Sequence, residues 1–254
     1  MNYIKNPNLP ENTVKCVLCD SRVEVEVFEE LTHLGIDVLT VPQYNELPNP
    51  ICAHPDIHCC HTGGREFVTS QYFSDNFNLQ VCRYFKKNKL CEKINNRVIE
   101  KELKREYPND VYLNAFVTSE YIICNAKLVA HEIIGNTDKK IIHVNQGYVK
   151  CSILPISDNA FITDDISIYN SAKKYFDVLY VEHGDILLEG YNYGFIGGSG
   201  GKISKDALAF FGDLKTHKNH FDIKKFCNNH NVQCVSLSNK RLYDYGSLIP
   251  LFEQ

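Results

Sequence analysis

The chain has 254 residues, 44% of them hydrophobic, with a formal net charge of -4 and an isoelectric point near 6.2. This is enough apolar material for a sizeable core, and the small negative charge gives no support for binding nucleic acid or an anionic membrane. The first residues contain no apolar stretch of the signal-peptide kind, and no run of about 18 apolar residues occurs, so we expect a cytoplasmic protein without a membrane segment.

Eleven cysteines are scattered through predicted strands and helices. An odd number in such positions is typical of reduced thiols that are mostly buried. Cys16 and Cys19 have the spacing of a redox pair or half a zinc site, but both lie in a strand-like run without a second pair at metal spacing. We interpret them as structural.

Up to residue 144 the chain alternates short apolar runs with segments of helical spacing. Residues 23–34 carry Glu-rich outward positions, and Gly35 ends them as a helix C-cap does. Residues 61–64 predict a hairpin turn between two short strands, after a loop marked by Pro48 and Pro50. The other predicted elements are strands 14–18 and 37–41, a helix 74–87, a charged surface segment 95–107, two strands within 110–125, a helix 127–134 and a strand 140–144.

Residues 147–201 contain the clearest repeating pattern. Strand 151–156, a turn at 157–159 and strand 160–163 are followed by a helix that Asp164 and Asp165 cap, and then by strand 177–181. The pattern starts again over residues 185–237, with a helix near 221–229, and residues 243–251 add one more apolar segment. We count about five strand-strand-helix-strand units.

Each unit leaves strand edges that only a neighbour covers. A linear stack of five units leaves exposed edges at both ends, whereas a closed ring leaves fewer. We therefore expect residues 243–251 to close the ring against the first strand. A ring also directs one strand of each unit toward a common axis, where we expect the site.

Five short segments stand out along the chain: Ala53-His54-Pro55-Asp56, Pro108-Asn109-Asp110-Val111, Tyr148-Val149-Lys150-Cys151, Tyr169-Asn170-Ser171-Ala172-Lys173-Lys174 and Asp244-Tyr245-Gly246-Ser247-Leu248-Ile249. In this order they resemble a pattern of dimethylarginine dimethylaminohydrolase. They fall on its Phe-Val-Glu-Asp, Gly-Gly-Asp-Val, His-Leu-Lys-Ser, Ser-Ala-Gln/Lys-Lys and Asp-Gly-x-x-x-Cys segments. The chain thus resembles the pentein, or guanidino-group-modifying, superfamily, which also contains arginine deiminase, agmatine deiminase and glycine amidinotransferase.

The resemblance implies an α+β pentein propeller, with about five pseudo-symmetric ββαβ units around an axial pocket. It implies a single domain over residues 1–254 and a bacterial branch of the superfamily. Those enzymes use a cysteine thiolate, a histidine and carboxylates that grip a planar cation. Asp56 and Asp110 fall on the carboxylates, but Tyr148 stands at the histidine and Ile249 at the cysteine, so the catalytic residues are left unassigned and the usual mechanism is expected to be lost.

Cys151 is close enough to Tyr148 in sequence to be considered as a substitute nucleophile, but its predicted orientation argues against this role. Strand alternation places Tyr148 and Lys150 on one face and Cys151 on the other, so we expect the two faces not to share a site. Tyr148, Lys150 and Asp244, which opens the closing segment, remain candidates for binding a ligand. His183 and Asp185, at the entry to the last unit, are further axial candidates.

The densest polar cluster runs from His54 to His61. As a strand it would place His54, Asp56, His58 and Cys60 on one face, which offers ligands to a transition metal. The alternative is that one or two of these residues line a polar cavity and the others pack. Because the set is no recognised metal site, we expect no bound metal and no cofactor. The glycines at 197–201 lack the Gly-Lys-Ser/Thr ending of a phosphate loop and predict a flexible turn.

The sequence therefore predicts a pentein-fold protein with an axial pocket for a small cationic or polar ligand, guanidino or amino-acid-like, and without the usual Cys/His pair. Two alternatives stay open: a divergent guanidine-modifying hydrolase or amidinotransferase that uses other residues, and a non-catalytic interaction module. Neither nucleic acid nor membrane is an expected partner, and the oligomeric state is left open.

Overall fold

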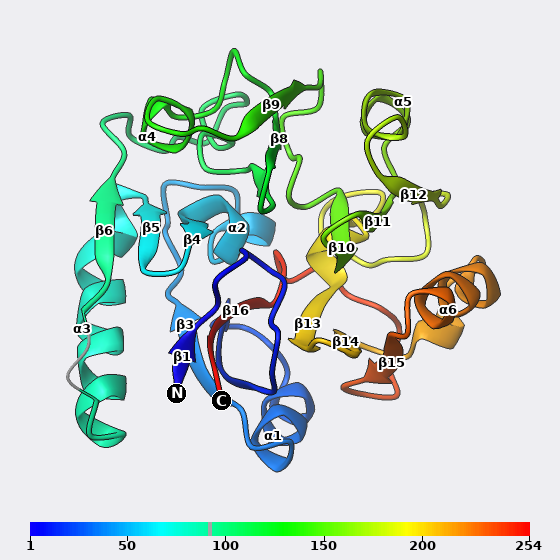
Figure 1. Ribbon diagram of the computed structural model, residues 1–254, viewed down its shortest axis with the longest axis horizontal. Helices are drawn as coiled ribbons and strands as arrows, with labels where there is room; N and C mark the ends of the chain where they lie inside the picture. Colours follow the sequence, from blue (N-terminus) through cyan, green and yellow to red (C-terminus); the bar gives the residue numbers. More distant parts are fainter. Residues whose placement is uncertain (91–92) are drawn as a thin grey trace.

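Five small sheets follow one another around a central axis in the computed structural model, which describes residues 1–90 and 93–254 (Figure 1). Within these residues one sheet has four strands and the others have three. The longer helices lie on the outside of the ring, and the strands lie toward its centre (Figure 1). This is the predicted ring of strand-strand-helix-strand units.

The third complete unit shows how the sequence builds the repeat. Strands β10 (Ile153–Ser157) and β11 (Ala160–Thr163) form an antiparallel hairpin, and helix α5 (Ile166–Ala172) then returns the chain to β12 (Asp177–Tyr180), parallel to β11. The Asp165 carboxylate caps α5 by accepting from the Ile168 N–H at 2.9 Å, as predicted. Three more units have the same topology. They are β4 (Cys59–Gly63), β5 (Glu66–Thr69), α3 (Gln71–Lys87) and β6 (Asn95–Val98); β7 (Phe116–Val117), β8 (Tyr121–Cys124), α4 (His131–Ile134) and β9 (Lys140–His143); and β13 (Gly200–Ser204), β14 (Ala207–Phe210), α6 (His220–Asn229) and β15 (Gln233–Ser236).

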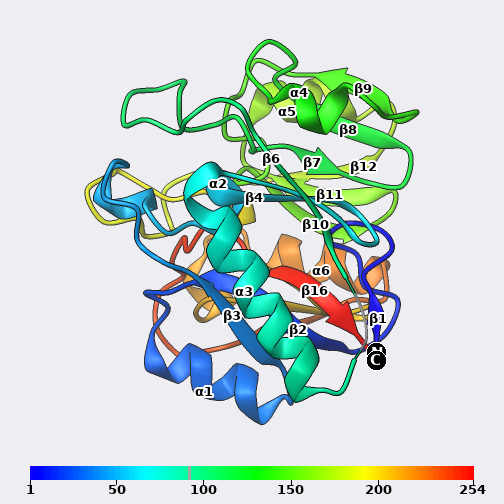
Figure 2. The same cartoon turned by 90° about the vertical axis from the view of Figure 1, so that its left-hand side faces the viewer.

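The first unit is assembled from both ends of the chain. Strand β16 (Ile249–Glu253) lies between β1 (Asn2–Tyr3) and β2 (Val14–Asp20), and β2 pairs in parallel with β3 (Asp37–Val41) after helix α1 (Val25–His33). Both chain ends meet at one edge of the ring (Figures 1 and 2). The prediction that the closing segment packs against the first unit is confirmed.

Helix α3 illustrates how the core fills the space outside each sheet. Phe73, Phe77 and Val81 follow one another at four-residue spacing and are buried against Phe67 of β5 and residues of the first sheet. Burying side chains of this size contributes about 1.5–3 kcal/mol each. The Ser70 hydroxyl caps α3 by accepting from the Phe73 N–H.

Three segments near the axis differ from their predicted structure. Residues 55–58 form a short helix, α2 (Pro55–His58), where Pro55 occupies the first turn, so the proposed strand face of His54, Asp56, His58 and Cys60 does not exist. Residues 148–152 form a turn that precedes β10. The glycine segment is buried, forming a 3₁₀ turn (Gly197–Ser199) and the start of β13, so the predicted flexible turn is wrong.

Of the helices in the described part of the chain, none combines the length and apolar character that crossing a membrane requires.

The glycine segment generates a prediction about stability. A Cβ on Gly197 would overlap the backbone carbonyl oxygens of Lys150, Cys151 and Ile153, none of which belongs to a flexible side chain. We expect Gly197→Ala to lower the free energy of unfolding by about 3 kcal/mol, at the upper end of ordinary overpacking, or to prevent folding. Urea unfolding followed by circular dichroism measures this.

Gly35→Ala is the matched control. Gly35 has a φ of +73°, but a Cβ at this position would meet no atom within 4 Å, so only backbone strain of about 1 kcal/mol is expected there. Equal stability losses in the two variants would contradict the steric argument.

Candidate functional site

A cavity of about 250 Å³ opens where four loops meet near the centre of the ring. In Figure 2 the loop around residue 50 and the loop around residue 190 extend from the same side of the molecule, and Pro50 approaches Gly190. The cavity is lined mainly by apolar and aromatic side chains, with few polar groups. Its lining residues are Ile51, His54, Ile57, Tyr148, Cys151, Leu188, Tyr191, Asn192, Tyr193, Phe195 and Asp244.

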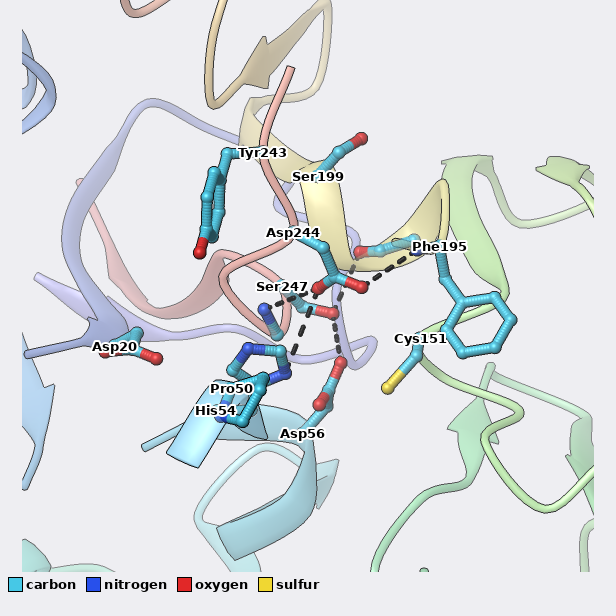
Figure 3. A network of polar contacts seen from close by, with 12 residues as sticks. Asp20, Pro50, His54, Asp56, Cys151, Phe195, Ser199, Tyr243, Asp244 and Ser247 are labelled. Atoms are coloured by element: carbon cyan, nitrogen blue, oxygen red, sulfur yellow. Dashed lines mark hydrogen bonds and ion pairs between the residues drawn. The ribbon is translucent and has the colours of Figure 1, made fainter. Parts of the chain in front are cut away.

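Asp244 supplies a carboxylate to this cavity. It accepts from the backbone N–H of Phe195 at 2.8 Å and of Gly246 at 2.9 Å, which fixes its orientation. Burial, together with the negative charge of Asp56, raises the pKa of Asp244 to about 7. The imidazole of His54 lies 3.9 Å from Asp244, but burial lowers the pKa of His54 to about 3, so the ring is neutral and does not neutralise the carboxylate (Figure 3).

A chain of buried polar groups lies directly behind the cavity. Lys150 donates from Nζ to Ser247 Oγ at 2.8 Å, and Ser247 Oγ lies 2.7 Å from Asp56 Oδ2 and 2.9 Å from the carbonyl oxygen of Gly197. Burial lowers the pKa of Lys150 and raises that of Asp56, while their mutual attraction opposes both shifts. The ammonium and the carboxylate therefore share the Ser247 hydroxyl as a bridge.

Cys151 lies on the same cavity as Tyr148, contrary to the prediction that the two would face apart. The prediction was wrong because residues 148–152 form a turn, in which strand alternation does not apply. The sulfur accepts from Asn114 Nδ2 at 3.1 Å and points toward Asp56 (Figure 3). Burial, followed by the negative charge of Asp56, raises the pKa of Cys151 well above its ordinary value, so the thiol is protonated near neutral pH.

Tyr148 joins a buried aspartate to the aromatic wall. Its hydroxyl donates to Asp110 Oδ2 at 2.5 Å, and its ring stacks on Phe195 with centroids 6.0 Å apart. Burial raises the pKa of both groups, with the Asp110 contact raising that of Tyr148 further. Asp110 is thus placed behind the phenol and does not line the cavity.

His183 and Asp185 lie outside the cavity. His183 Nδ1 is 3.5 Å from buried Asp164 Oδ2, and the imidazole stacks on Tyr193 at 4.5 Å, so it supports the aromatic wall from behind. The Asp164 contact raises the pKa of His183. Asp185 accepts from the Lys218 N–H at the surface.

The remaining histidines of the His54–His61 segment have structural partners. His58 bonds to Ser70 Oγ at 3.0 Å and to the Cys52 carbonyl at 3.1 Å, while His61 bonds to the Gly64 carbonyl at 3.0 Å. In residues 1–90 and 93–254, no three His, Cys, Asp or Glu side chains converge as metal ligands.

The structure thus divides the predicted site residues into three groups. The first group lines the cavity, the second lies behind it, and the third lies elsewhere. These groups are His54, Tyr148 and Asp244; Asp56, Asp110 and Lys150; and His61, His183 and Asp185.

Sequence reasoning missed two parts of the site. The first is the loop 188–195, whose Tyr, Asn and Gly composition is typical of a binding loop and was the available signal. The second is Ser247, whose hydroxyl contacts Lys150 and Asp56 behind the cavity, whereas Ile249 belongs to β16 and packs in the core.

Comparison with solved structures finds the same architecture in guanidino-modifying proteins. Inosamine-phosphate amidinotransferase StrB1 from Streptomyces griseus has a TM-score of 0.58 at 11% identity, covering 99% of this chain and 97% of that one. SxtG, an amidinotransferase of the saxitoxin pathway from Microseira wollei, has 0.59 at 8% identity, covering 98% of each chain. Agmatine deiminase from C. jejuni has 0.51 at 11% identity, covering 92% and 91%.

At these identities the likeness establishes the fold alone, and the fold is the pentein fold. The predicted pentein fold and the predicted α+β propeller class are confirmed. A search of curated protein sequences finds no match. A family model described as "Family of unknown function (DUF6873)" matches residues 18–249, which is most of the chain. The chain belongs to this family, which we therefore place in the pentein fold.

Proposed function

We propose that the protein binds a small organic cation in the central cavity and lacks the Cys/His chemistry of guanidine-modifying enzymes. The observation that carries the proposal is the buried carboxylate of Asp244, which lies on an aromatic-walled cavity; among the described residues no Lys or Arg forms an ion pair with it, and the nearby His54 is neutral. A ligand cation would supply the charge that the carboxylate lacks.

Buried carboxylates outnumber buried cations around the cavity. Asp56, Asp110, Asp164 and Asp244 are each about 1% exposed, and the buried ammonium of Lys150 interacts with two of them, Asp56 and Asp244. Within the described residues, the Oδ1 atoms of Asp56, Asp110 and Asp164 have no hydrogen-bond partner. A positively charged ligand offsets this excess of negative charge better than a neutral or anionic one does.

The cavity wall suits the same ligand class. Tyr148, Tyr191, Tyr193 and Phe195 present aromatic faces, which attract guanidinium and ammonium groups through the ring quadrupole. The volume of 250 Å³ suits a ligand of amino-acid or polyamine size. The name of one structural neighbour, agmatine deiminase, supplies a first probe, because agmatine is a guanidino cation of this size.

The ionisation states favour binding over turnover. The nucleophile would be a protonated thiol at Cys151, and the imidazole nearest the carboxylate, His54, takes up a proton only near pH 3. Tyr148, at the place of the superfamily's histidine, has its phenol fixed on Asp110 and its pKa raised further. A group that does not exchange protons near neutral pH is a poor general acid or base.

The enzyme alternative rests on one observation. The Cys151 sulfur lines the cavity beside Asp56, so an electrophilic carbon of a bound ligand has a thiol within the same site. A bound cation would also lower the thiol pKa by its charge. The catalytic test below separates this alternative from simple binding.

The first binding prediction concerns Asp244. Asp244→Asn keeps the shape of the side chain but removes its charge, and a charge-assisted hydrogen bond contributes about 1.5–3 kcal/mol, so agmatine affinity should fall at least about tenfold. Isothermal titration calorimetry measures the affinity. Glu189→Gln removes an equal charge from an exposed position on the loop that forms the wall, and should leave affinity nearly unchanged. Equal losses in both variants would indicate long-range attraction only.

The second prediction concerns pH. Because the pKa of Asp244 is raised to about 7, cation affinity should increase about tenfold per unit between about pH 5 and 7 and then level off. Binding should release a proton, detectable as a dependence of the calorimetric heat on buffer ionisation. A folded-state pKa above the unfolded value also means that this group's contribution to stability is lost as pH rises toward 7. In the Asp244→Asn variant, cation affinity should no longer increase between about pH 5 and 7.

The third prediction concerns catalysis. We expect no release of citrulline, ammonia or methylamine from arginine, agmatine or methylated arginines, as measured by colorimetric ureido and ammonia assays. Turnover that Cys151→Ala abolishes would replace the binding proposal with the enzyme alternative. Turnover that survives Cys151→Ala would place the nucleophile elsewhere on the axis.

A further inference from the structure

Two cysteines of the last unit face each other between a sheet and its helix, away from the central cavity. Lys202, Leu208 and Cys234 are paired neighbours across β13, β14 and β15, so their side chains lie on the same face of the sheet. Helix α6 covers that face and buries Cys227 there, in one hydrophobic cluster with Leu208 and Cys234. The thiols of Cys227 and Cys234 and the amine of Lys202 therefore lie between the sheet and helix α6.

The two thiols differ in access and in charge. Cys227 is fully buried in the hydrophobic cluster against which Cys234 packs, and Cys234 is half-buried at the sheet edge. Interaction with the Cys227 thiol lowers the pKa of Cys234, burial opposes this shift, and Lys224 and Lys202 lower the pKa further. Burial lowers the pKa of Lys202 to about 8, and its amine donates to the carbonyl of Lys205 at 2.7 Å. Cys234 is therefore the more nucleophilic and the more accessible sulfur.

We propose that Cys227 and Cys234 form a redox-active dithiol that hydroperoxides oxidise to an intramolecular disulfide. Cys234 acts as the attacking thiolate because it is the more accessible sulfur, and Cys227 acts as the resolving thiol because it is buried in the cluster against which Cys234 packs. This site is separate from the central cavity, since neither cysteine lines it.

The chemistry balances in two steps. The Cys234 thiolate attacks the hydroxyl oxygen of the hydroperoxide, an S–O bond forms as the O–O bond breaks, and the leaving alkoxide takes a proton from solvent. Cys227 sulfur then attacks the resulting Cys234 sulfenic acid, and hydroxide leaves with the Cys227 proton as water. Two thiols are oxidised and one peroxide is reduced to alcohol and water.

The disulfide would join the last turn of α6 to β15 across the connection formed by residues 228–233. This connection is already drawn tight by the Val232 N–H, which donates to the Cys227 carbonyl at 2.9 Å. Oxidation therefore adds a covalent bond where helix and strand already meet and requires no rearrangement of the ring.

Mass spectrometry of the intact protein treated with hydrogen peroxide tests the proposal. No Lys or Arg lies between Phe226 and Lys240, so both cysteines fall in one tryptic peptide, residues 226–240. We expect that peptide to become two hydrogens lighter and to lose both alkylation sites, and dithiothreitol should restore them. Cys82→Ser removes an exposed thiol on α3 and should leave this oxidation unchanged.

Two variants separate the roles of the sulfurs. Cys227→Ser should stop at a Cys234 sulfenic acid that dimedone traps, whereas Cys234→Ser should leave Cys227 alkylatable after the same treatment. If the wild-type peptide keeps both alkylation sites at peroxide doses that oxidise Cys82, the proposal is wrong. It is equally wrong if Cys234 in the wild type proceeds to sulfinic acid without forming the disulfide.

Discussion

The carboxylate of Asp244 holds together three parts of the chain that are distant in sequence. It accepts from the N–H groups of Phe195 and Gly246 and faces His54 at the start of α2. The surrounding backbone must come close for this to happen. A Cβ on Gly198 would overlap the carboxylate, and Gly246, at a φ of +71°, leaves no room for a side chain beside His54. Residues 188–195, the closing segment and α2 are therefore arranged around one buried carboxyl group, whose ionised form is costly to bury and is stabilised by the two N–H groups.

The ring itself was predictable because its signals are local. Asp165 caps a helix, Gly35 ends one, and apolar runs alternate with turn residues in a repeating order. The unpaired edges of each unit then imply closure. The central segments were not predictable in this way. Pro55 permits either a helix start or a strand edge, and only the packed surroundings select the helix. Gly197 and Gly198 look flexible in sequence, but carbonyl groups from another unit pack closely against Gly197, and the Gly198 N–H donates to the carbonyl of Cys151.

The same distinction explains the site. Residue types could be identified from the sequence, as Asp56, Tyr148 and Asp244 show, but the direction of each side chain depended on where a strand begins. Because β10 begins only at Ile153, Tyr148 and Cys151 lie in a turn where strand alternation does not apply, and both line the cavity. In the closing segment, Ser247 sits at a φ of +75° two residues before β16 begins, and its hydroxyl, not Ile249, contacts the buried Asp56. Such starting points are set by tertiary contacts.

The position of β16 has a consequence for the order of folding. Four sheets pair strands that lie close together in sequence, so each can form as soon as its own segment has left the ribosome. The remaining sheet pairs residue 2 with residue 253 and Leu18 with Ile249. Until β16 is synthesised, β2 exposes an apolar edge whose natural neighbour does not yet exist, and this edge is open to pairing with other chains. During synthesis, the earliest strands are therefore the last to be protected from aggregation.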